Sequence, residues 1–358
     1  MKVCIKGIGV IGGFGCGTKS LEEAVIDQSS PMSEPLRKSF GPDETALVTP
    51  ELVADMALLS RFVPPKALRR VDHYSRMAIL AGYLALQDAK SDLGMDEGLP
   101  EPMGVIVATG MGPTAGTLDS QSPDADAADL RLSPIQFSNS VHNAAAAYIS
   151  MLLKIRGPNV SINQYDMSVP LAFQTAMDWL EEGRAASVLV GGVDCFSKGL
   201  YDASLCTPNR KDGNGGRRPV PVGEGSAFFV LTLSGAIETR YPFIHDVRIG
   251  RCLQDIALPS SALILHNGSG EEAALLCPAT RQAVFSHVYG AFPSSMALDL
   301  AMAALLLKKD PCRNELFPHF DFGPDFMKNP RICCLKKGVA GDLGLIDLRP
   351  PISQPSAR

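Results

Sequence analysis

The sequence is poor in aromatic residues and has no long hydrophobic run. Of its 358 residues, 6% are aromatic and one is tryptophan. No apolar stretch approaches the roughly 18–20 residues that a membrane-spanning helix needs, so no membrane span is expected. Acidic residues outnumber basic residues by 38 to 33, for a net charge of −5 with neutral histidines. This balance argues against a protein that binds nucleic acid by neutralising phosphates.

The sequence also lacks the spacing of a metal site or of a disulfide framework. Its nine cysteines form no CxxC motif and no regular pattern. No metal-ligand spacing joins His73, His142, His245 and His319. Reduced thiols, no metal ion and no other cofactor are therefore expected. Residues 1–6 start neither a long apolar segment nor a small-residue cleavage site, which predicts a cytoplasmic protein.

What is present is enough apolar material for a large core. Hydrophobic residues make up 46% of the chain and charged residues 20%, which excludes disorder. The length allows two or three domain-sized units, or two halves around one shared sheet. Residues 3–10 form a buried-strand pattern that enters a glycine turn at 12–15. That turn lacks the G-x-G-x-x-G spacing of a dinucleotide site.

The next segments alternate between helix and strand patterns. Residues 71–89 form an amphipathic pattern typical of a helix, and 104–110 predict a buried strand. The alanine-rich helix predicted over 140–155 should pack closely against another element or subunit. A strand over 159–163 and a helix from Asp166 to Glu182 follow. Such an order describes an α/β unit with buried strands.

The remaining helix and strand patterns are shorter. Strands are predicted over 187–192, 227–231 and 262–265, a helix over 294–307, and a hairpin over 332–348 bent at 338–341. Gly183 should end the helix that precedes the first of these strands. Loops are expected over 28–66, 117–129 and 206–218, and a flexible tail over 349–358.

Taken in order, these segments resemble the β-ketoacyl-acyl carrier protein synthases (ketosynthases) of the thiolase fold. The similarity covers most of 1–240 clearly and 260–348 more weakly, and it rests on the segments VDHYSRMAILAGYLALQDA, GVIVATGMG, GPNVSI, Gly191-Gly192-Val193-Asp194 and Gly223-Glu224-Gly225. The resemblance implies an α/β fold of two pseudo-repeated halves in five layers (αβαβα). It places one half at 1–240 and a shortened half at 241–348, and it implies a dimer.

The resemblance also implies decarboxylative Claisen condensation, in which a cysteine at a helix N-terminus carries the acyl chain as a thioester. Aligned on Gly157-Pro158, Gly183 and Gly191-Gly192, the cysteine position falls on Asp166. A carboxylate is a weak nucleophile toward thioesters, so acyl transfer is not expected. Asp166 should instead stabilise the helix N-terminus or mimic an anion.

The other catalytic positions implied by the resemblance also differ. The first histidine is matched by His266, but the lysine position falls on Phe285 and the second histidine position on Gly290. His287 lies three positions too early to replace that histidine. The family's gating loop carries a phenylalanine, whereas this chain has Gly338, Val339, Ala340 and Gly341. We therefore expect no intact catalytic site.

An inactive ketosynthase homologue is similar to the chain-length factors of type II polyketide systems, which pair with an active ketosynthase. The segment 140–144 resembles ketosynthase-like proteins of aryl polyene pathways. The pairing edge is expected near 160–164. Acyl carrier protein should dock mainly on the partner; the basic residues that a carrier site here would need are Arg69, Arg70, Arg217 and Arg218. The expected tunnel and interface residues are Phe137, His142, Gln164, Tyr165, Met167 and Phe173.

Two alternatives remain open from the sequence. The chain could be a stand-alone malonyl-acyl carrier protein decarboxylase, or another carrier-dependent enzyme, that uses Asp166 and His266. It could also be a homodimeric protein that binds acyl carrier protein through basic residues.

Overall fold

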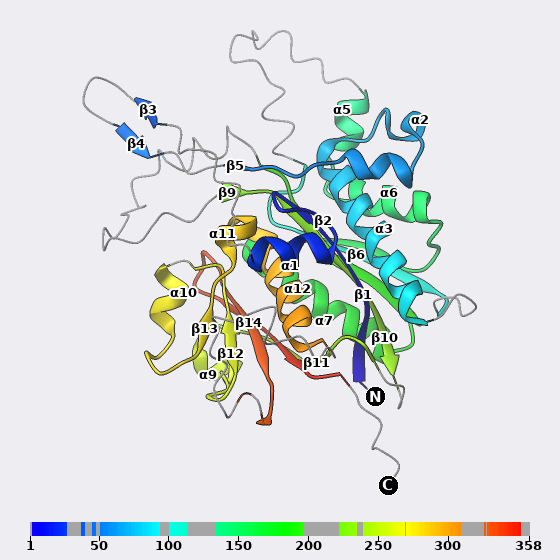
Figure 1. Cartoon of the computed structure of the whole chain (residues 1–358). Helices are drawn as coiled ribbons and strands as arrows, with labels where there is room; N and C mark the ends of the chain where they lie inside the picture. The colour runs from blue at the N-terminus through cyan, green and yellow to red at the C-terminus, as the bar shows by residue number, and fades with distance from the viewer. Residues whose placement is uncertain are drawn as a thin grey trace.

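The computed structural model describes most of the chain, and its elements are labelled in Figure 1. The described residues are 2–26, 37–39, 45–47, 51–93, 100–113, 134–196, 222–234, 239–268, 270–308, 326 and 328–351. The predicted loops at 117–129 and 206–218, most of 28–50 and most of the predicted tail lie outside these residues. Of the helices that the structure describes, none combines the length and hydrophobicity needed to cross a bilayer.

The N-terminal half runs to the end of β10. Its strands are β1 (Lys2–Gly12), β2 (Gly15–Cys16), β3 (Arg37–Ser39), β4 (Thr45–Leu47), β5 (Glu51–Leu52), β6 (Met103–Thr109), β7 (Asn159–Asn163), β8 (Ser187–Asp194), β9 (Val222–Gly223) and β10 (Gly225–Ser234). Its helices are α1 (Thr18–Ile26), η1 (Ala57–Arg61), α2 (Pro65–Leu68), α3 (His73–Leu93), α5 (Pro134–Asn139), α6 (Ala144–Leu153), η2 (Tyr165–Met167) and α7 (Ser168–Glu181), where η marks a 3₁₀ helix.

The C-terminal half begins at β11. Its strands are β11 (Phe243–Gly250), β12 (Leu263–Leu265), β13 (Gln282–Ala283), β14 (Ile332–Lys337) and β15 (Leu343–Arg349). Its helices are α9 (Leu253–Ile256), α10 (Gly270–Leu275), α11 (Ser286–Tyr289), η3 (Pro293–Ser295) and α12 (Met296–Leu307). The expected boundary at residue 240 falls between β10 and β11.

The two halves repeat one strand order. The N-terminal half has the order β7-β6-β8-β10-β1, and the C-terminal half has β13-β12-β14-β15-β11. In each half the first three strands are parallel and the last two pair antiparallel. The halves join where β1 pairs with β11. This repeat is the pseudo-symmetry that the resemblance to ketosynthases implied.

Helices α7 and α12 lie between the two halves (Figure 1). Helix α7 packs on β8 and β6 but also on β11 and β15, and α12 packs on β14 and β15 but also on β10 and β1. The outer face of the N-terminal half carries α3 and α6, and α9 and α10 pack on the strands of the C-terminal half. The resulting order is helix, sheet, helix, sheet, helix, which confirms the five-layer prediction.

Close backbone approach explains the glycines of β1. A Cβ on Gly9 would overlap the carbonyl oxygen of Ala81, and one on Gly7 would overlap that of Ala85. Helix α3 therefore rests directly on the strand, with its alanines facing the glycines. Small residues line both sides of this contact between α3 and the sheet. Glycine is needed at residues 7 and 9 because a larger side chain would leave no room for the helix backbone.

Most predicted elements are confirmed. The differences concern helix starts and elements that were not predicted, such as strand β11 and the elements β3, β4, β5 and η1 inside the predicted loop 28–66. Strand β7 has the predicted bounds, and Gly183 ends α7 with a φ of +71°. The alanine-rich helix is shorter than predicted and packs on α3 and β6. The helix expected from Asp166 starts at Ser168, because residues 165–167 form the tighter turn η2.

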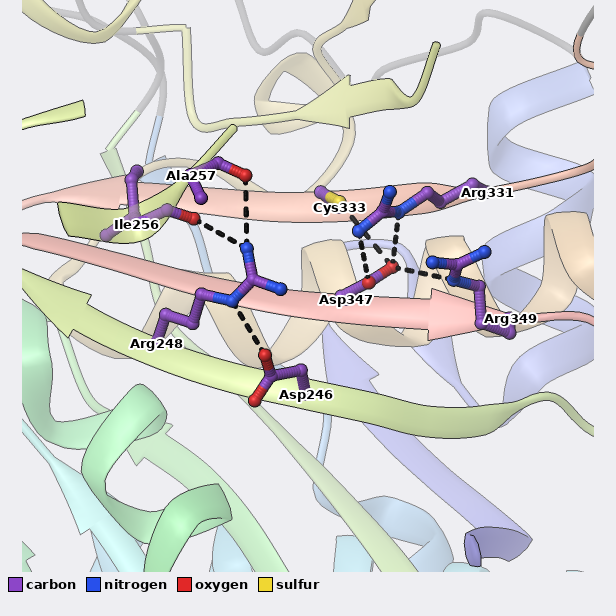
Figure 2. A network of polar contacts seen from close by, with 8 residues as sticks. All are labelled: Asp246, Arg248, Ile256, Ala257, Arg331, Cys333, Asp347 and Arg349. Carbon is purple, nitrogen blue, oxygen red and sulfur yellow. Dashed lines mark hydrogen bonds and ion pairs between the residues drawn. The ribbon is translucent and has the colours of Figure 1, made fainter. Parts of the chain in front are cut away.

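A charged network braces the outer face of the C-terminal half (Figure 2). Asp347 on β15 is fully buried and accepts two hydrogen bonds from Arg331, at 3.0 and 2.6 Å. Arg349 Nε lies 3.4 Å from the same carboxylate. On β11, Asp246 faces Asp347 in register and pairs with Arg248 at 2.6 Å. The arginines compensate two carboxylates that would otherwise repel each other across the strands.

Candidate functional site

The candidate site begins at the turn that joins β7 to α7. Tyr165 has a φ of +48°, in the left-handed region that a bulky residue rarely adopts. Ser168 stabilises this turn because its hydroxyl accepts a hydrogen bond from the Gln164 N–H at 2.8 Å. The same hydroxyl lies 2.7 Å from the Tyr165 carbonyl and 2.8 Å from the Thr109 carbonyl, either of which can accept its proton. The strained backbone presents residue 166 at the start of α7.

Asp166 forms an ion pair rather than a helix cap. Its Oδ1 lies 3.2 Å from Nζ of Lys336, and the two side chains are 12% and 2% exposed. The N-cap residue of α7 is Met167, which makes no side-chain cap hydrogen bond. The carboxylate of Asp166 turns toward β14 and pairs with Lys336, although Asp166 lies in the first turn of η2, where a negative charge was expected. Burial raises the pKa of Asp166, the nearby carboxylates of Glu272 and Asp342 add to the rise, and the Lys336 ammonium offsets it only in part.

Lys336 was not singled out from the sequence. Strand β14 is otherwise apolar at its inward positions, where Ile332 and Cys334 join the central core. Alternation along the strand places Lys336 on that same inward face. A lysine at an inward position of an otherwise apolar strand is the sequence feature that could have identified Lys336 as a buried charged residue.

Further ionisable side chains lie buried beside this pair. Asp299 on α12 accepts a short hydrogen bond from the Tyr289 hydroxyl, and burial raises its pKa to about 6. Glu272 on α10 accepts hydrogen bonds from the backbone N–H groups of Asn267 at 3.2 Å and Lys337 at 3.1 Å. Electrostatic interactions connect Asp166, Glu272, Asp299 and Lys336. Neither Asp299 nor Glu272 was predicted, since they come from separate elements.

His266 belongs to the same buried cluster, but its ring nitrogens are engaged. Nε2 lies 2.9 Å from Gln282 Oε1, and Nδ1 lies 3.1 Å from the Gly268 N–H and 3.6 Å from Glu272. Burial lowers the pKa of His266, but the hydrogen bonds with Glu272 and Gln282 outweigh that effect and raise it. The imidazole is 1% exposed, so solvent reaches neither nitrogen freely.

The two positions assigned to the lysine and second histidine contain no ionisable side chain. Phe285 is buried and precedes α11, and Gly290 follows α11 with a φ of +81°. His287 is exposed and lies on α11. Within the described residues, no group of three or more cysteine, histidine or carboxylate side chains is arranged to hold a metal ion.

A pocket of about 280 Å³ adjoins Asp166. One side is formed by residues 163–167, and the other by the gating loop, which we define as residues 338–341, and by Asp342. Val339 is 85% exposed, so it does not fill the pocket as a buried side chain would. The structure thus brings together the gating loop and the predicted nucleophile position, but His266 does not line the pocket.

The predicted tunnel residues fall into two groups. Phe137, His142, Gln164 and Tyr165 are exposed, and Phe137 is exposed by 63%. Met167 and Phe173 are buried, and the Phe173 ring makes an edge contact with Phe229 in the central core. Phe173 is therefore a core residue, whereas Met167 lines the pocket.

The chain is similar to one curated protein and two solved structures described below. Nodulation protein E of Rhizobium meliloti is 26% identical over 236 residues, which cover 64% of this chain and 57% of that protein. The solved structure titled the ishigamide ketosynthase/chain length factor matches with a TM-score of 0.69 and 17% identity, over 98% of this chain and 99% of that chain. A type II PKS acyl-carrier protein in complex with its ketosynthase bound to the hexaketide (AntDE:AntF) contains a chain that matches with a TM-score of 0.71 and 16% identity, over 97% and 99%.

These structural matches show the thiolase-like ketosynthase fold, and the chain spans little more than half the length of the curated relative. The family described as "Beta-ketoacyl synthase, N-terminal domain" matches residues 3–206, which is more than half of the sequence. The chain belongs to the β-ketoacyl synthase family.

Proposed function

We propose that this chain is a non-catalytic ketosynthase homologue that pairs with an active ketosynthase as a chain-length-factor-like subunit. The single observation that carries the proposal is the ion pair at the nucleophile position, where Asp166 lies 3.2 Å from the buried Lys336. Acyl transfer to a carboxylate would give a mixed anhydride, which water hydrolyses. The site therefore cannot hold a stable acyl intermediate.

The other positions support the same conclusion. Phe285 and Gly290 cannot donate a hydrogen bond from a side chain to an enolate, and the ring nitrogens of His266 already have partners. A stand-alone decarboxylase would need such a donor in the pocket. No contact in the described part of the chain favours that alternative, although only an assay tests it.

The proposed pairing surface with the active ketosynthase is the open edge of the sheet at β7. Strand β7 is the last strand of its sheet and pairs with β6 alone among the described strands. Exposed apolar side chains lie on the neighbouring elements α5, α6 and η2 and in the segment before α6: Ile135, Phe137, Val141, Met151 and Tyr165. An unpaired strand edge beside apolar side chains is suited to strand addition by a second ketosynthase-fold subunit.

The matched structures suggest the class of partner and product. One is named as a ketosynthase/chain length factor and another as a type II PKS ketosynthase with its acyl-carrier protein. We assign this chain to a type II polyketide system, with an aryl polyene product as the specific proposal. Acyl carrier protein would meet exposed basic side chains at Arg61, Lys66, Arg69 and Arg70. Arg217 and Arg218 lie outside the described residues.

Co-expression with an active ketosynthase from the same organism tests the proposal. Size-exclusion chromatography and native mass spectrometry should give a one-to-one complex, and the chain alone should not consume malonyl-acyl carrier protein. Phe137→Glu should weaken the complex at least tenfold, because it places a charge on the apolar surface. Ile26→Glu, at another exposed apolar position on α1, is the matched control and should leave it intact. A homodimer that ignores the ketosynthase and decarboxylates the malonyl group would contradict the proposal.

A further inference from the structure

We propose that Lys336 is a positioning residue that, by pairing with Asp166, fixes the gating loop beside the nucleophile position. The inference deepens the proposed non-catalytic function and rests on it. It accounts for a buried ammonium group that the sequence analysis did not single out.

The base of the gating loop is held by contacts with two different elements. Lys336 and Lys337 are the last residues of β14 and directly precede the loop. The Lys336 side chain contacts Asp166 of the N-terminal half, and the Lys337 backbone N–H donates to Glu272 of α10 at 3.1 Å. Two consecutive residues are thus held from two different elements. The loop cannot leave η2 unless at least the first of these contacts breaks.

A glycine opposite Lys336 allows Asp166 to come within reach of the Lys336 ammonium group. Lys336 lies opposite Gly344 in the β14–β15 register. A Cβ on Gly344 would overlap Pro170 of α7 and approach Met167 of η2. The glycine therefore lets η2 and the start of α7 rest directly on β15, which brings the Asp166 carboxylate to the Lys336 ammonium group.

The gating loop is held together by its own backbone hydrogen bonds. The Gly338 N–H donates to the Asp342 carbonyl at 2.8 Å, and the Gly341 N–H donates to the Gly338 carbonyl at 2.9 Å. Gly341 has a φ of +85°. These bonds make the loop a compact turn whose position follows the end of β14. Holding Lys336 therefore holds the whole wall of the pocket.

The charges around Lys336 decide which variant of the ion pair should still fold. The Lys336 ammonium lies 3.2 Å from Asp166 and also interacts with Asp299, which in turn interacts with Glu272 and His266. Removing Asp166 alone leaves the ammonium with Asp299, so Asp166→Ala should still fold. Removing Lys336 instead leaves Asp166 and Asp299 without that cation, and Lys336→Met is the harsher variant.

Hydrogen–deuterium exchange of the full chain tests the proposal. In Asp166→Ala, peptides that cover 163–168 and 336–343 should exchange at least tenfold faster than in the wild type, while β8 remains protected. Lys336→Met should accelerate the same two segments, and the double variant should add little beyond either single change. Asp347→Ala is the matched control, because it breaks the Arg331 ion pair on the opposite face of the same two strands.

Either of two results would overturn the inference. One is wild-type exchange at the gating loop in folded Asp166→Ala, and the other is uniform acceleration across the chain in that variant. If Lys336→Met does not fold, Asp166→Ala alone decides the outcome. Because exchange is measured on the isolated chain, its result is separate from the co-expression result. A chain that fails to pair with a ketosynthase can still show the expected local exchange. Likewise, a chain that pairs with a ketosynthase can show wild-type exchange at the gating loop in Asp166→Ala.

Discussion

Asp166 occupies the position that the family pattern assigns to the nucleophile, and its neighbour Lys336 is 2% exposed. A thiol at residue 166 would meet the same ammonium group. An adjacent cation favours the thiolate, so Asp166→Cys should have a lower thiol pKa than the Asp166→Cys/Lys336→Met double variant, by about 1 unit or more. The pH dependence of iodoacetamide alkylation at residue 166, followed by mass spectrometry, measures the difference.

Equal alkylation profiles in the two proteins would show that Lys336 does not act on residue 166 in solution. The single variant should still not catalyse condensation, because Phe285 and Gly290 replace the lysine and second histidine of the family. Restored condensation would mean that those two positions have been assigned wrongly.

A second residue-scale prediction concerns pH. Burial raises the pKa of Asp299 from 3.8 to about 6, so the folded protein keeps a proton that the unfolded chain releases near pH 4. The free energy of unfolding should therefore fall as pH rises from about 4 to 6.5, by about 3 kcal/mol for this group. Urea unfolding across this range should show the fall in the wild type.

Asp299→Asn should remove that part of the pH dependence. The raised pKa of Asp166 acts in the same direction, but it is present in both proteins and largely cancels in their difference. An Asp299→Asn protein with the full wild-type slope would contradict the assignment.

At the scale of elements, the contact of α3 with β1 depends on glycine. A side chain on Gly9 would overlap the backbone of Ala81, which cannot move without displacing the helix. Gly9→Val should therefore destabilise the protein by about 3 kcal/mol or more. Gly183→Ala is the comparison, because a Cβ there meets nothing and the cost of about 1 kcal/mol comes from its positive φ alone. Thermal unfolding of both variants checks the order.

Element prediction succeeded where the hydrophobic pattern is long and failed where a turn is decided by distant contacts. The patterns of α3, β7 and β8 follow from local periodicity. The start of α7 did not, because Tyr165 is held in the left-handed region by Ser168, which itself contacts the Thr109 carbonyl of β6. A local pattern contains no information about Thr109.

At the scale of the whole molecule, the two halves share one central layer. Since α7 and α12 each pack on strands of both halves, neither half has a complete core without the other. Unfolding should be a single transition. The fluorescence of Trp179, the single tryptophan, which lies on α7, and far-UV circular dichroism should give coincident denaturation curves.

Met302→Ala on α12 sharpens this test. Met302 is fully buried in the central core, so the change should cost about 2–5 kcal/mol and shift both curves together. Ile26→Ala, at an exposed position, should shift neither appreciably. A shift of the circular dichroism curve alone would mean that the halves unfold separately.

The sequence by itself determined the buried strands, the long helices and the carboxylate at residue 166, because each depends on local periodicity or on spacing along the chain, and the resemblance to ketosynthases implied the two halves. Only the tertiary structure decided what that carboxylate does. Lys336, Glu272 and Asp299 are 64 residues or fewer from one another but 106 or more from Asp166, counted on the numbering. Lys336 and Glu272 act directly on Asp166, and both also interact with Asp299, because β14, α10 and α12 bring these charges together in a buried interior, where proximity rather than sequence order sets the interaction energy.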